Sequence, residues 1–564
     1  MDHLKHLVCL AATVPLGVVL AMAGAAGSSA WSGMSAERML ETIKVLSSDE
    51  YEGRAPASKG EELATRFIAT QFKELGLKPG NPDGTYFQNV PMVGITADPS
   101  AVLVLRGPDG KQTGLKFADD FVAFTKHQEP TVSIDADMVF VGYGVVAPEY
   151  KWDDFKGVDV KGKVIVVLIN DPPVPDPHDP SKLDEKTFKG KAMTYYGRWT
   201  YKFEMAAEKG AAGCLIVHQT GPAGYPWGVV KTSNTGEQFD LETPDKGMSR
   251  STIEGWITHE RAKELFAMAG KDFDALEKTA VRRDFHPVDL GVKASLTLKN
   301  AVRTIESKNV VAKLEGSDPK LRDEYVIYTA HWDHLGIGPE VNGDKIYHGA
   351  VDNASGVAGL LEVARAYTKV QPPPRRSILF LSVTGEEKGL LGSQYYAQHP
   401  LYPNVKTLAD INMDGTNVLG RTKDIEIIGL GQSTLDDIVK AVAAEQGRVV
   451  RPDSEPEKGF YYRSDHFCFA KEGVPALDPD SGIDYVGKPA GWGMEMRNKF
   501  TEEDYHKPSD QVKPYWDLSG AVEDLQLFAE VGYRVANAKT YPTWKAGSEF
   551  KARREEALKH AAGK

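Results

Sequence analysis

The sequence predicts an α/β protein with a mixed, mostly parallel central sheet that is flanked by helices and carries a second, β-rich module. Two observations lead to this fold class. Between about residues 305 and 446, apolar strands alternate with helices, and continuous apolar strands are typical of parallel sheets that are covered on both faces. Between residues 131 and 290, short β-type runs are separated by loops rich in proline and glycine.

The composition is that of an ordinary globular protein. Of the 564 residues, 41% are hydrophobic and 26% charged, and 67 basic against 79 acidic side chains give a net charge of −12. This excludes a disordered, collagen-like or coiled-coil chain. We expect no nucleic-acid partner, because phosphate contacts need a basic face. The three cysteines are too few for a disulfide scaffold, and we expect Cys214 and Cys468 to be buried free thiols.

The N-terminus has the pattern of a signal peptide over residues 1–30. Residues 7–26 carry no charge, Lys5 precedes them, and small alanines follow where cleavage would occur. A retained membrane anchor is the alternative, because the apolar run approaches the ~20 residues that span a bilayer. Pro15 and the small-residue tail favour cleavage. We therefore expect an exported protein, periplasmic or secreted, without stable membrane association.

Residues 31–130 are predicted to form the N-terminal part of a catalytic domain. Leucine, isoleucine and phenylalanine recur at helical spacing over residues 59–75. The β-rich module is predicted over residues 131–290, with apolar runs at Met138–Val146 and Lys163–Ile169. The order of these segments predicts that the module is inserted into the catalytic domain.

The main part of the catalytic domain is predicted over residues 291–545, and a charged tail over 546–564 follows it. Its buried strands are predicted at Tyr325–Thr329, Ile378–Val383 and Leu408–Met413. Parallel strands bring their carboxyl ends to one edge of a sheet, where ligands bind. The helices between and after these strands are predicted at Val357–Tyr367, Leu390–Ala397 and Leu435–Gln446.

Polar clusters follow each of the three strands. One more lies between the first two strands, and another comes much later in the chain, at residues 504–510. Histidine together with carboxylates suits a metal such as zinc, manganese or cobalt. Motifs for other chemistries are missing, since the chain has neither G-x-S-x-G nor a phosphate-binding P-loop. The clustered residues are His331, Asp333, Asp352, Glu386, Glu387, Asp414, Tyr505 and His506.

Taken together, these motifs resemble the two-zinc exopeptidases of metallopeptidase family 28, to which bacterial secreted aminopeptidases and glutamate carboxypeptidase belong. The resemblance covers about residues 305–540 and the N-terminal helix region, and it implies the zinc exopeptidase fold. The 131–290 module resembles the protease-associated (PA) domain that many members carry as an insert. The motifs are His331-x-Asp333, Gly-x-x-Asp352-Asn-x-Ser-Gly, Thr-Gly-Glu386-Glu387-x-Gly-Leu-x-Gly-Ser, Asn-Met-Asp414 and Tyr505-His506.

The resemblance implies two zinc ions per chain. His331, Asp352 and Asp414 would bind one zinc ion. Asp352, Glu387 and His506 would bind the other, so that Asp352 bridges the two. Anionic ligands suit such a site, because four positive charges so close together repel strongly and three carboxylates offset them.

The resemblance also implies roles for neighbouring residues. Asp333 would orient the histidine two residues before it. Glu386 would be the general base that takes a proton from water and passes it to the leaving amine. Tyr505 would hydrogen-bond the oxyanion. The peptide bond between Asp352 and Asn353 is expected to be cis, a feature of many family members.

Three further histidines carry weaker expectations. We expect His334 and His348 to be part of the loop structure. Ser464-Asp465-His466 resembles a family stretch near the substrate pocket, and whether His466 contacts substrate stays open.

The function favoured by the sequence is an exported zinc aminopeptidase that cleaves N-terminal peptide bonds of peptide substrates. A carboxypeptidase-type or dipeptidase-type enzyme of the same fold is the alternative, and the former needs a basic pocket for the substrate's free carboxylate. A non-enzymatic binding protein is disfavoured, because all five ligand positions and Glu386 are filled. Side-chain specificity and oligomeric state are not readable from the sequence.

The module of residues 131–290 is expected to pack beside the metal cleft and limit access to it, rather than to bind metal. Its histidines stand apart from carboxylate clusters. Its loops at 195–199 and 224–227 carry aromatic residues, and aromatic side chains in loops often meet a substrate or partner.

Overall fold

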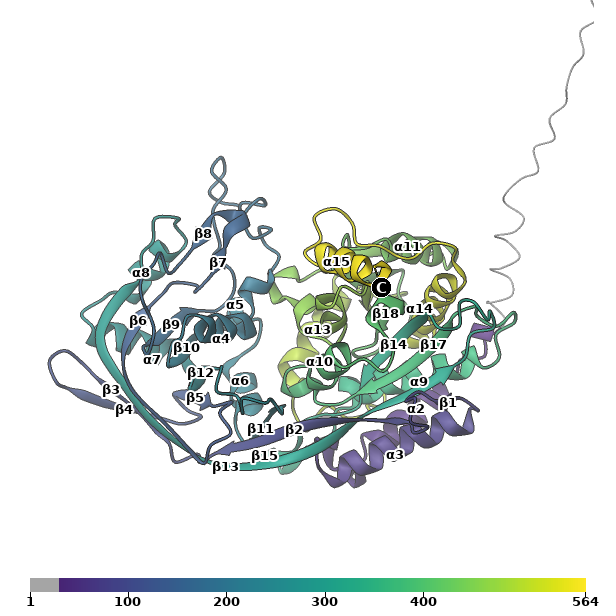
Figure 1. The fold of residues 1–564 in the computed structure, drawn as a ribbon, viewed down its shortest axis with the longest axis horizontal. Helices are drawn as coiled ribbons and strands as arrows, with labels where there is room; N and C mark the ends of the chain where they lie inside the picture. The colour runs from purple at the N-terminus through teal and green to yellow at the C-terminus, as the bar shows by residue number, and fades with distance from the viewer. Residues whose placement is uncertain (1–29, 564) are drawn as a thin grey trace, which may run out of the picture.

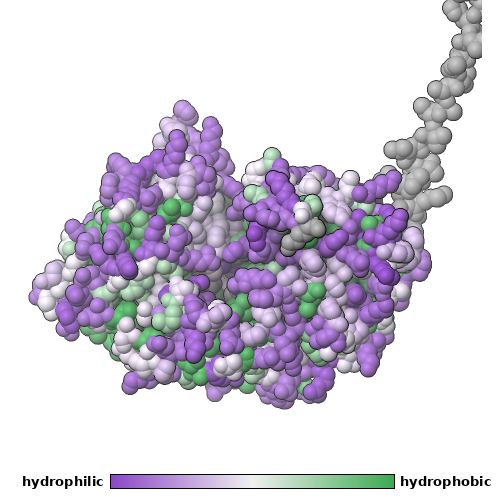
Figure 2. Space-filling model, viewed as in Figure 1, coloured by the Kyte–Doolittle hydropathy of each residue, from purple (hydrophilic) through white to green (hydrophobic). Residues whose placement is uncertain are grey.

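The computed structural model describes residues 30–563, so the predicted signal peptide lies outside the described residues except for its last one. This part of the chain forms two domains that share one long strand, β13 (Val288–Leu314), which runs along the lower edge of both (Figure 1). The space-filling view shows a mostly hydrophilic surface with a notch between the two domains (Figure 2). None of the described helices combines the length and the apolar character that crossing a bilayer requires.

The catalytic domain is built on a mixed sheet whose centre is parallel. Its four central strands pair in parallel, and antiparallel strands extend the sheet on both sides. This confirms the predicted fold class. The strand order is β11 (Glu237–Leu241), β2 (Phe87–Ala97), β13, β17 (Ser377–Val383), β14 (Tyr325–His331), β18 (Thr407–Asn412), β21 (Ala476–Ser481), β19 (Asp424–Ile428) and β20 (Val449–Pro452).

Helices cover both faces of this sheet because its central strands are apolar on both faces. Val326 and Tyr328 of β14 pack into one core, and Tyr325 and Ile327, which point the other way, pack into a second. The first core is covered by α2 (Ala36–Leu46), α3 (Lys59–Glu74), α9 (Gly356–Tyr367), α11 (Leu435–Glu445) and α14 (Ser519–Asn537). The second is covered by α10 (Leu391–Gln398) and α12 (His466–Lys471).

The helix predicted over residues 59–75 is α3. It begins after Ser58, whose hydroxyl accepts a hydrogen bond from the Glu61 amide and so caps the helix. It ends at Glu74, and Gly76 follows in the left-handed conformation that favours glycine. Its buried face includes Ile68 and Phe72.

The second domain contains a smaller sheet with its own core. Its centre is parallel, and β13 provides one of its strands. The domain also contains α4 (Trp199–Glu208), α6 (Trp227–Asn234), α7 (His259–Met268) and α8 (Phe273–Ala280). The strand order is β4 (Gln112–Lys116), β3 (Val102–Arg106), β13, β6 (Thr131–Phe140), β9 (Val164–Leu168), β10 (Gly213–His218), β12 (Ile253–Thr258) and β5 (Phe121–Phe124).

The core of the second domain extends beyond the limits expected for the inserted module. It includes Leu103 and Leu115, which precede residue 131, and Leu298, which follows residue 290. The pairing of β3 with β13 joins segments almost 190 residues apart in the sequence, and sequence periodicity carries no information on such long-range partners. The expected start at residue 131 therefore differs from the observed extent of this core.

β13 passes from one sheet to the other without a loop. Residues 293–299 pair with β6, and residues 300–310 pair with β2. The hydrogen bonds from Asp98 N to Lys299 O and from Asn300 N to Pro130 O, both 2.8 Å long, lie at this transition. The two domains are thus joined through continuous backbone pairing.

The predicted state of two cysteines is confirmed. Cys214 lies on β10 and Cys468 on α12, and both are buried free thiols.

Candidate metal centre and substrate cleft

The predicted site residues of the catalytic sheet meet at one edge. His331 is the last residue of β14. Glu386 follows β17 after two residues, and Asp414 follows β18 after one. Since these three strands are adjacent and parallel, their carboxyl ends bring the side chains together.

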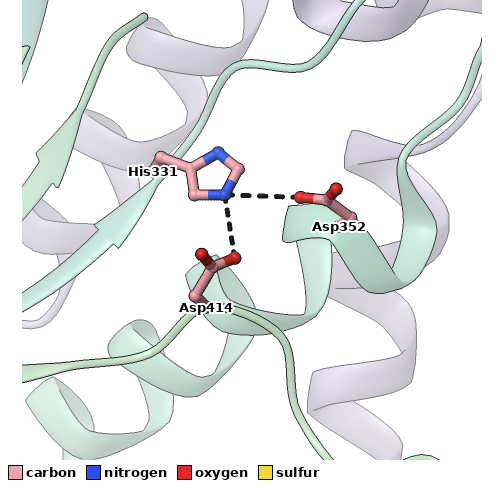
Figure 3. Close-up of side chains that lie close together, drawn as sticks. All are labelled: His331, Asp352 and Asp414. Atoms are coloured by element: carbon pink, nitrogen blue, oxygen red, sulfur yellow. Dashed lines mark hydrogen bonds and ion pairs between the residues drawn. The ribbon is translucent and has the colours of Figure 1, made fainter. Parts of the chain in front are cut away.

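His331 faces two carboxylates that come from different elements (Figure 3). Its Nε2 atom lies 3.1 Å from Asp414 Oδ1 and 3.4 Å from Asp352 Oδ1. Asp352 lies in the irregular turn Ala350–Ser355 that precedes α9. The three residues form a group whose ligand atoms lie within 4.8 Å of one another.

The other oxygen of Asp352 faces a second histidine. His506 Nε2 lies 3.4 Å from Asp352 Oδ2 and 3.0 Å from Glu387 Oε2. His506 follows α13 (Trp492–Glu503), and its ring stacks on that of Tyr505 with centroids 3.9 Å apart. Asp352 therefore presents one oxygen to each of two histidines.

His334 is a further member of this cluster. Its Nδ1 lies 2.5 Å from Glu387 Oε1, and its Nε2 is buried without a hydrogen-bond partner among the described residues. His334, Asp352 and Glu387 form a second group of potential ligands within 4.8 Å. This contact differs from the expectation that His334 is part of the loop structure, because its position three residues after His331 does not by itself indicate contact with Glu387.

Burial and neighbouring charges shift the pKa values of the two adjacent glutamates, Glu386 and Glu387, in opposite directions. Burial and Asp352 raise the pKa of Glu387, but the positive charges of His506 and His334 outweigh them and lower it to about 2. The pKa of Glu386 is instead raised well above its usual value, by burial first and also by the charges of Asp414 and Glu387. Neighbouring carboxyl groups with diverging pKa values can serve as an ionised ligand and a proton carrier.

The backbone around Asp352 is held by Asn353 and Asp510. The Asn353 amide oxygen accepts hydrogen bonds from Gly356 N and Gly415 N, and its amide nitrogen donates to Met413 O. The Asp510 carboxylate accepts from Val351 N at 3.0 Å and Asp352 N at 3.1 Å. The Asp352–Asn353 peptide bond is cis, as predicted.

A buried arginine holds the loops that carry the histidines. Arg54 is fully buried, and its guanidinium donates to four backbone carbonyl groups at distances of 2.6–2.9 Å. These acceptors belong to Leu46, Trp332, His348 and Gly349. No sequence motif marked Arg54, because its partners are backbone atoms.

Gly349 packs too tightly against this cluster to carry a side chain. A β carbon there would lie 2.3 Å from Asp352 O and 2.6 Å from the His334 ring, and its φ of +56° also favours glycine.

The contacts of the Asp333 side chain differ from the expectation that it orients His331. Its carboxylate accepts a hydrogen bond from Glu386 N at 3.1 Å. The His331 Nδ1 atom is 3.8 Å from that carboxylate but 3.1 Å from the Asp333 backbone oxygen. The backbone carbonyl is therefore the closer partner of His331, and the side chain of Asp333 fixes the turn that carries Glu386.

Glu386 lines two cavities. The first, which we call the catalytic-domain cavity, has a volume of 310 Å³ and is lined mainly by residues 414–516, including Ile428, Ile483 and Phe500. The second, which we call the interdomain cavity, has a volume of 300 Å³ and lies between residues 95–256 and residues 386–506. Glu386, Tyr505, Arg463 and Tyr225 line both.

The second domain lies against the site through aromatic and polar side chains. Tyr225 sits under the Arg463 guanidinium at 5.5 Å, and Ser233 Oγ lies 3.5 Å from His506 Nδ1. His466, in contrast, is fully buried against Tyr461 and lines neither cavity. His348 hydrogen-bonds Ser47 O in the loop structure, as expected.

Comparison with known proteins finds a family that part of the chain resembles. Residues 309–529, which contain all five predicted metal ligands, match the model of peptidase family M28. This match covers less than half of the chain, and it agrees with the family that the sequence motifs resemble. Metallopeptidases of this family use zinc.

Relatives and solved structures resemble the chain to different extents. A probable zinc metalloprotease of Pyrenophora teres is 42% identical over 106 residues, which cover 19% of this chain and 22% of the relative. Leupeptin-inactivating enzyme 1 of Streptomyces exfoliatus is 27% identical over 36% of this chain and 43% of its own length. The chain thus spans less than half of either relative. An aminopeptidase from Aneurinibacillus sp. strain AM-1 shares the fold, with a TM-score of 0.53 and 21% identity over 90% of this chain and 96% of that one.

Proposed function

We propose that the chain is a zinc-dependent aminopeptidase with two zinc ions, which removes N-terminal residues from peptides. The observation that carries this proposal is the position of Asp352, whose two oxygens each lie 3.4 Å from a different histidine. A shared carboxylate between two histidine-containing ligand sets is the arrangement that a pair of nearby metal ions requires.

The donor set fits zinc. His331, Asp352 and Asp414 would hold one ion, and Asp352, Glu387 and His506 the other. Nitrogen and carboxylate ligands are those that zinc prefers in catalytic sites. The buried Nε2 of His334 has no hydrogen-bond partner among the described residues, which is consistent with a cluster organised around cations. When bound, two zinc ions acidify a water molecule and polarise the scissile carbonyl group.

Glu386 is proposed to carry the proton. It lines both cavities, and its Oε2 atom lies 4.0 Å from His331 Nε2. Its amide is fixed by Asp333, so the side chain leaves a defined turn. From this position Glu386 would accept a proton from the attacking water and deliver it to the leaving amine.

Tyr505 is proposed to stabilise the substrate's carbonyl oxygen as negative charge develops on it. The Tyr505 hydroxyl accepts a hydrogen bond from Arg463 Nη2 at 3.3 Å, so its own proton is free to be donated. Burial raises the pKa of Tyr505 far above its usual value, which keeps that proton in place. Preorganised donors of this kind favour acyl-transfer chemistry.

The two cavities support an exopeptidase rather than an endopeptidase. The apolar lining of the catalytic-domain cavity, with Ile428, Ile483, Met496 and Phe500, suits an apolar N-terminal side chain. The second domain narrows the approach from the other side through Tyr225 and Ser233. We propose that this domain limits access to the site, and that the enzyme acts on peptides after export directed by residues 1–30.

The test compares leucine p-nitroanilide with its N-acetylated form, while the zinc content of the same protein is measured. We expect turnover of the free amine only and two zinc ions per chain. Turnover of the blocked substrate alone, or no zinc after purification without chelator and no reactivation by added zinc, would contradict the proposal.

A further inference from the structure

One buried histidine contacts the proposed metal centre without belonging to either proposed ligand set. His334 is fully buried, and its Nδ1 atom lies 2.5 Å from Glu387 Oε1. The other oxygen of this glutamate, Oε2, lies 3.0 Å from His506 Nε2. The two oxygens of Glu387 thus face two different histidines, of which only His506 is a proposed ligand.

The distances separate a hydrogen bond from ligands that share a metal ion. Zinc binds nitrogen and oxygen at about 2.0–2.2 Å, so two ligand atoms of one tetrahedral ion lie about 3.3 Å apart. Four ligand pairs of the two proposed zinc positions lie 3.0–3.4 Å apart. The 2.5 Å between His334 and Glu387 is too short for a common ion and fits a hydrogen bond to an ionised acceptor. Nδ1 of His334 is therefore the donor, because an ionised carboxylate has no proton to give.

Packing holds the His334 ring in this orientation. Gly349 lies so close that a β carbon there would be 2.6 Å from the ring. The His506 ring meets the His334 ring edge to face, with centroids 5.8 Å apart. The backbone amide of His334 also donates to Arg54 O at 3.3 Å. Because the ring is enclosed on these sides, its Nδ1 donor stays directed at Glu387.

Glu387 needs such a partner to have a defined orientation. Its residue lies in the short turn Glu386–Lys388, which is flanked by two glycines in the left-handed conformation. The last torsion of a glutamate side chain has broad energy minima, so the carboxylate plane is set by its contacts. Within residues 30–563, the hydrogen bond that the Glu387 side chain accepts comes from His334. The direction of Oε2 therefore depends on this histidine.

We propose that His334 orients Glu387 so that Oε2 alone faces the second metal position, and that this favours zinc over metals that need more ligands. The inference rests on the proposed two-zinc function. Zinc in proteins usually has four ligands, whereas manganese suits about six, mostly oxygen. A freed second oxygen of Glu387 would add a ligand and so favour the higher coordination number. His334 is a positioning residue, since it acts through Glu387.

The experiment measures metal affinity rather than turnover. The full chain loaded with zinc is titrated with a chelator of known affinity, and the same titration is repeated after exchange into manganese. His334→Leu removes the donor, and His334→Asn keeps an amide nitrogen near the place of Nδ1. The matched control is His348→Leu, because His348 is also buried but hydrogen-bonds Ser47 O and Asp344 Oδ2 instead of a proposed ligand.

We expect His334→Leu to weaken the binding of one of the two zinc ions by about 10–100-fold, as is typical when the partner of a metal ligand is removed. Manganese affinity at the same position should fall less, so the preference for zinc over manganese should drop about tenfold. His334→Asn should keep most of this preference. His348→Leu should lower the unfolding midpoint and leave the ratio of the two affinities unchanged.

An unchanged zinc-to-manganese ratio in His334→Leu would overturn the inference, whether or not zinc affinity falls, and so would an equal change of that ratio in His348→Leu. If His334→Leu does not fold, His334→Gln replaces it, because the amide nitrogen of glutamine reaches the place of Nε2 rather than that of Nδ1. The wild-type ratio in His334→Gln would then overturn the inference. Fewer than two zinc ions in the wild-type protein would instead count against the proposed function.

Discussion

Replacing Arg54 by methionine tests whether the metal centre depends on a residue that never touches it. The guanidinium makes four hydrogen bonds to backbone oxygens, and each hydrogen bond to a charged group contributes about 1.5–3 kcal/mol. Burial lowers the pKa of Arg54 to about 10, so the charge that is removed also carried a desolvation cost of several kcal/mol. When this desolvation cost is subtracted from the contribution of the four hydrogen bonds, the substitution should lower the free energy of unfolding by about 3–5 kcal/mol.

The assay is urea denaturation of Arg54→Met at saturating zinc, combined with measurement of zinc affinity. We expect both to fall, because the carbonyl groups of His348 and Gly349 precede Asp352 in the same loop. Arg66→Met on α3 is the control. Arg66 is exposed and makes no ion pair with the described residues, so its change should stay within ~0.5 kcal/mol. A wild-type midpoint and wild-type zinc affinity in Arg54→Met would refute the reasoning, and if that variant does not fold, Arg54→Lys should show a smaller loss of the same kind.

Substitutions at three further positions address the site directly. Glu386→Gln should keep bound zinc but lose turnover by about 10²–10⁴-fold, because an amide cannot accept the proton. Glu387→Gln should lower zinc occupancy first, and equal zinc loss in both variants would contradict this division of roles. Asp510→Ala leaves two part-buried backbone donors, Val351 N and Asp352 N, without their acceptor. It should lower the unfolding free energy by about 2–5 kcal/mol and weaken zinc affinity. Asp510→Asn keeps one acceptor and should be milder, which thermal denaturation and metal titration can establish.

The sequence predicts the parts of this structure that depend on local pattern. The strands that end at His331 and near Asp414 were recognisable as continuous apolar runs followed by polar clusters, and the parallel pairing of these strands follows from their alternation with helices. The helix predicted at Val357–Tyr367 is α9, and Asp352 lies in the turn that precedes it. These features require only the periodicity of apolar residues and the rule that ligands gather at the carboxyl ends of parallel strands.

Other features depend on contacts that periodicity does not encode. The contact of His334 with Glu387 joins residues 53 positions apart, and Arg54 acts on backbone atoms almost 300 positions away. The core of the second domain includes residues from strands before residue 131, since β3 pairs with β13 across a long sequence interval. Arg463 lines both cavities in place of His466, which turns into the core beside Tyr461.

The uninterrupted course of β13 restricts how the length of this chain can vary. Side chains alternate along a strand, so inserting or deleting one residue would turn every later side chain to the opposite face. In β13 such a change would disturb one sheet or the other, because residues 293–299 serve the second domain and residues 300–310 the catalytic domain. The number of residues across this junction is therefore constrained by the pairing on both of its sides. We expect insertions and deletions to be tolerated in surface turns such as that between β3 and β4, where they would not change the strand pairing of either domain.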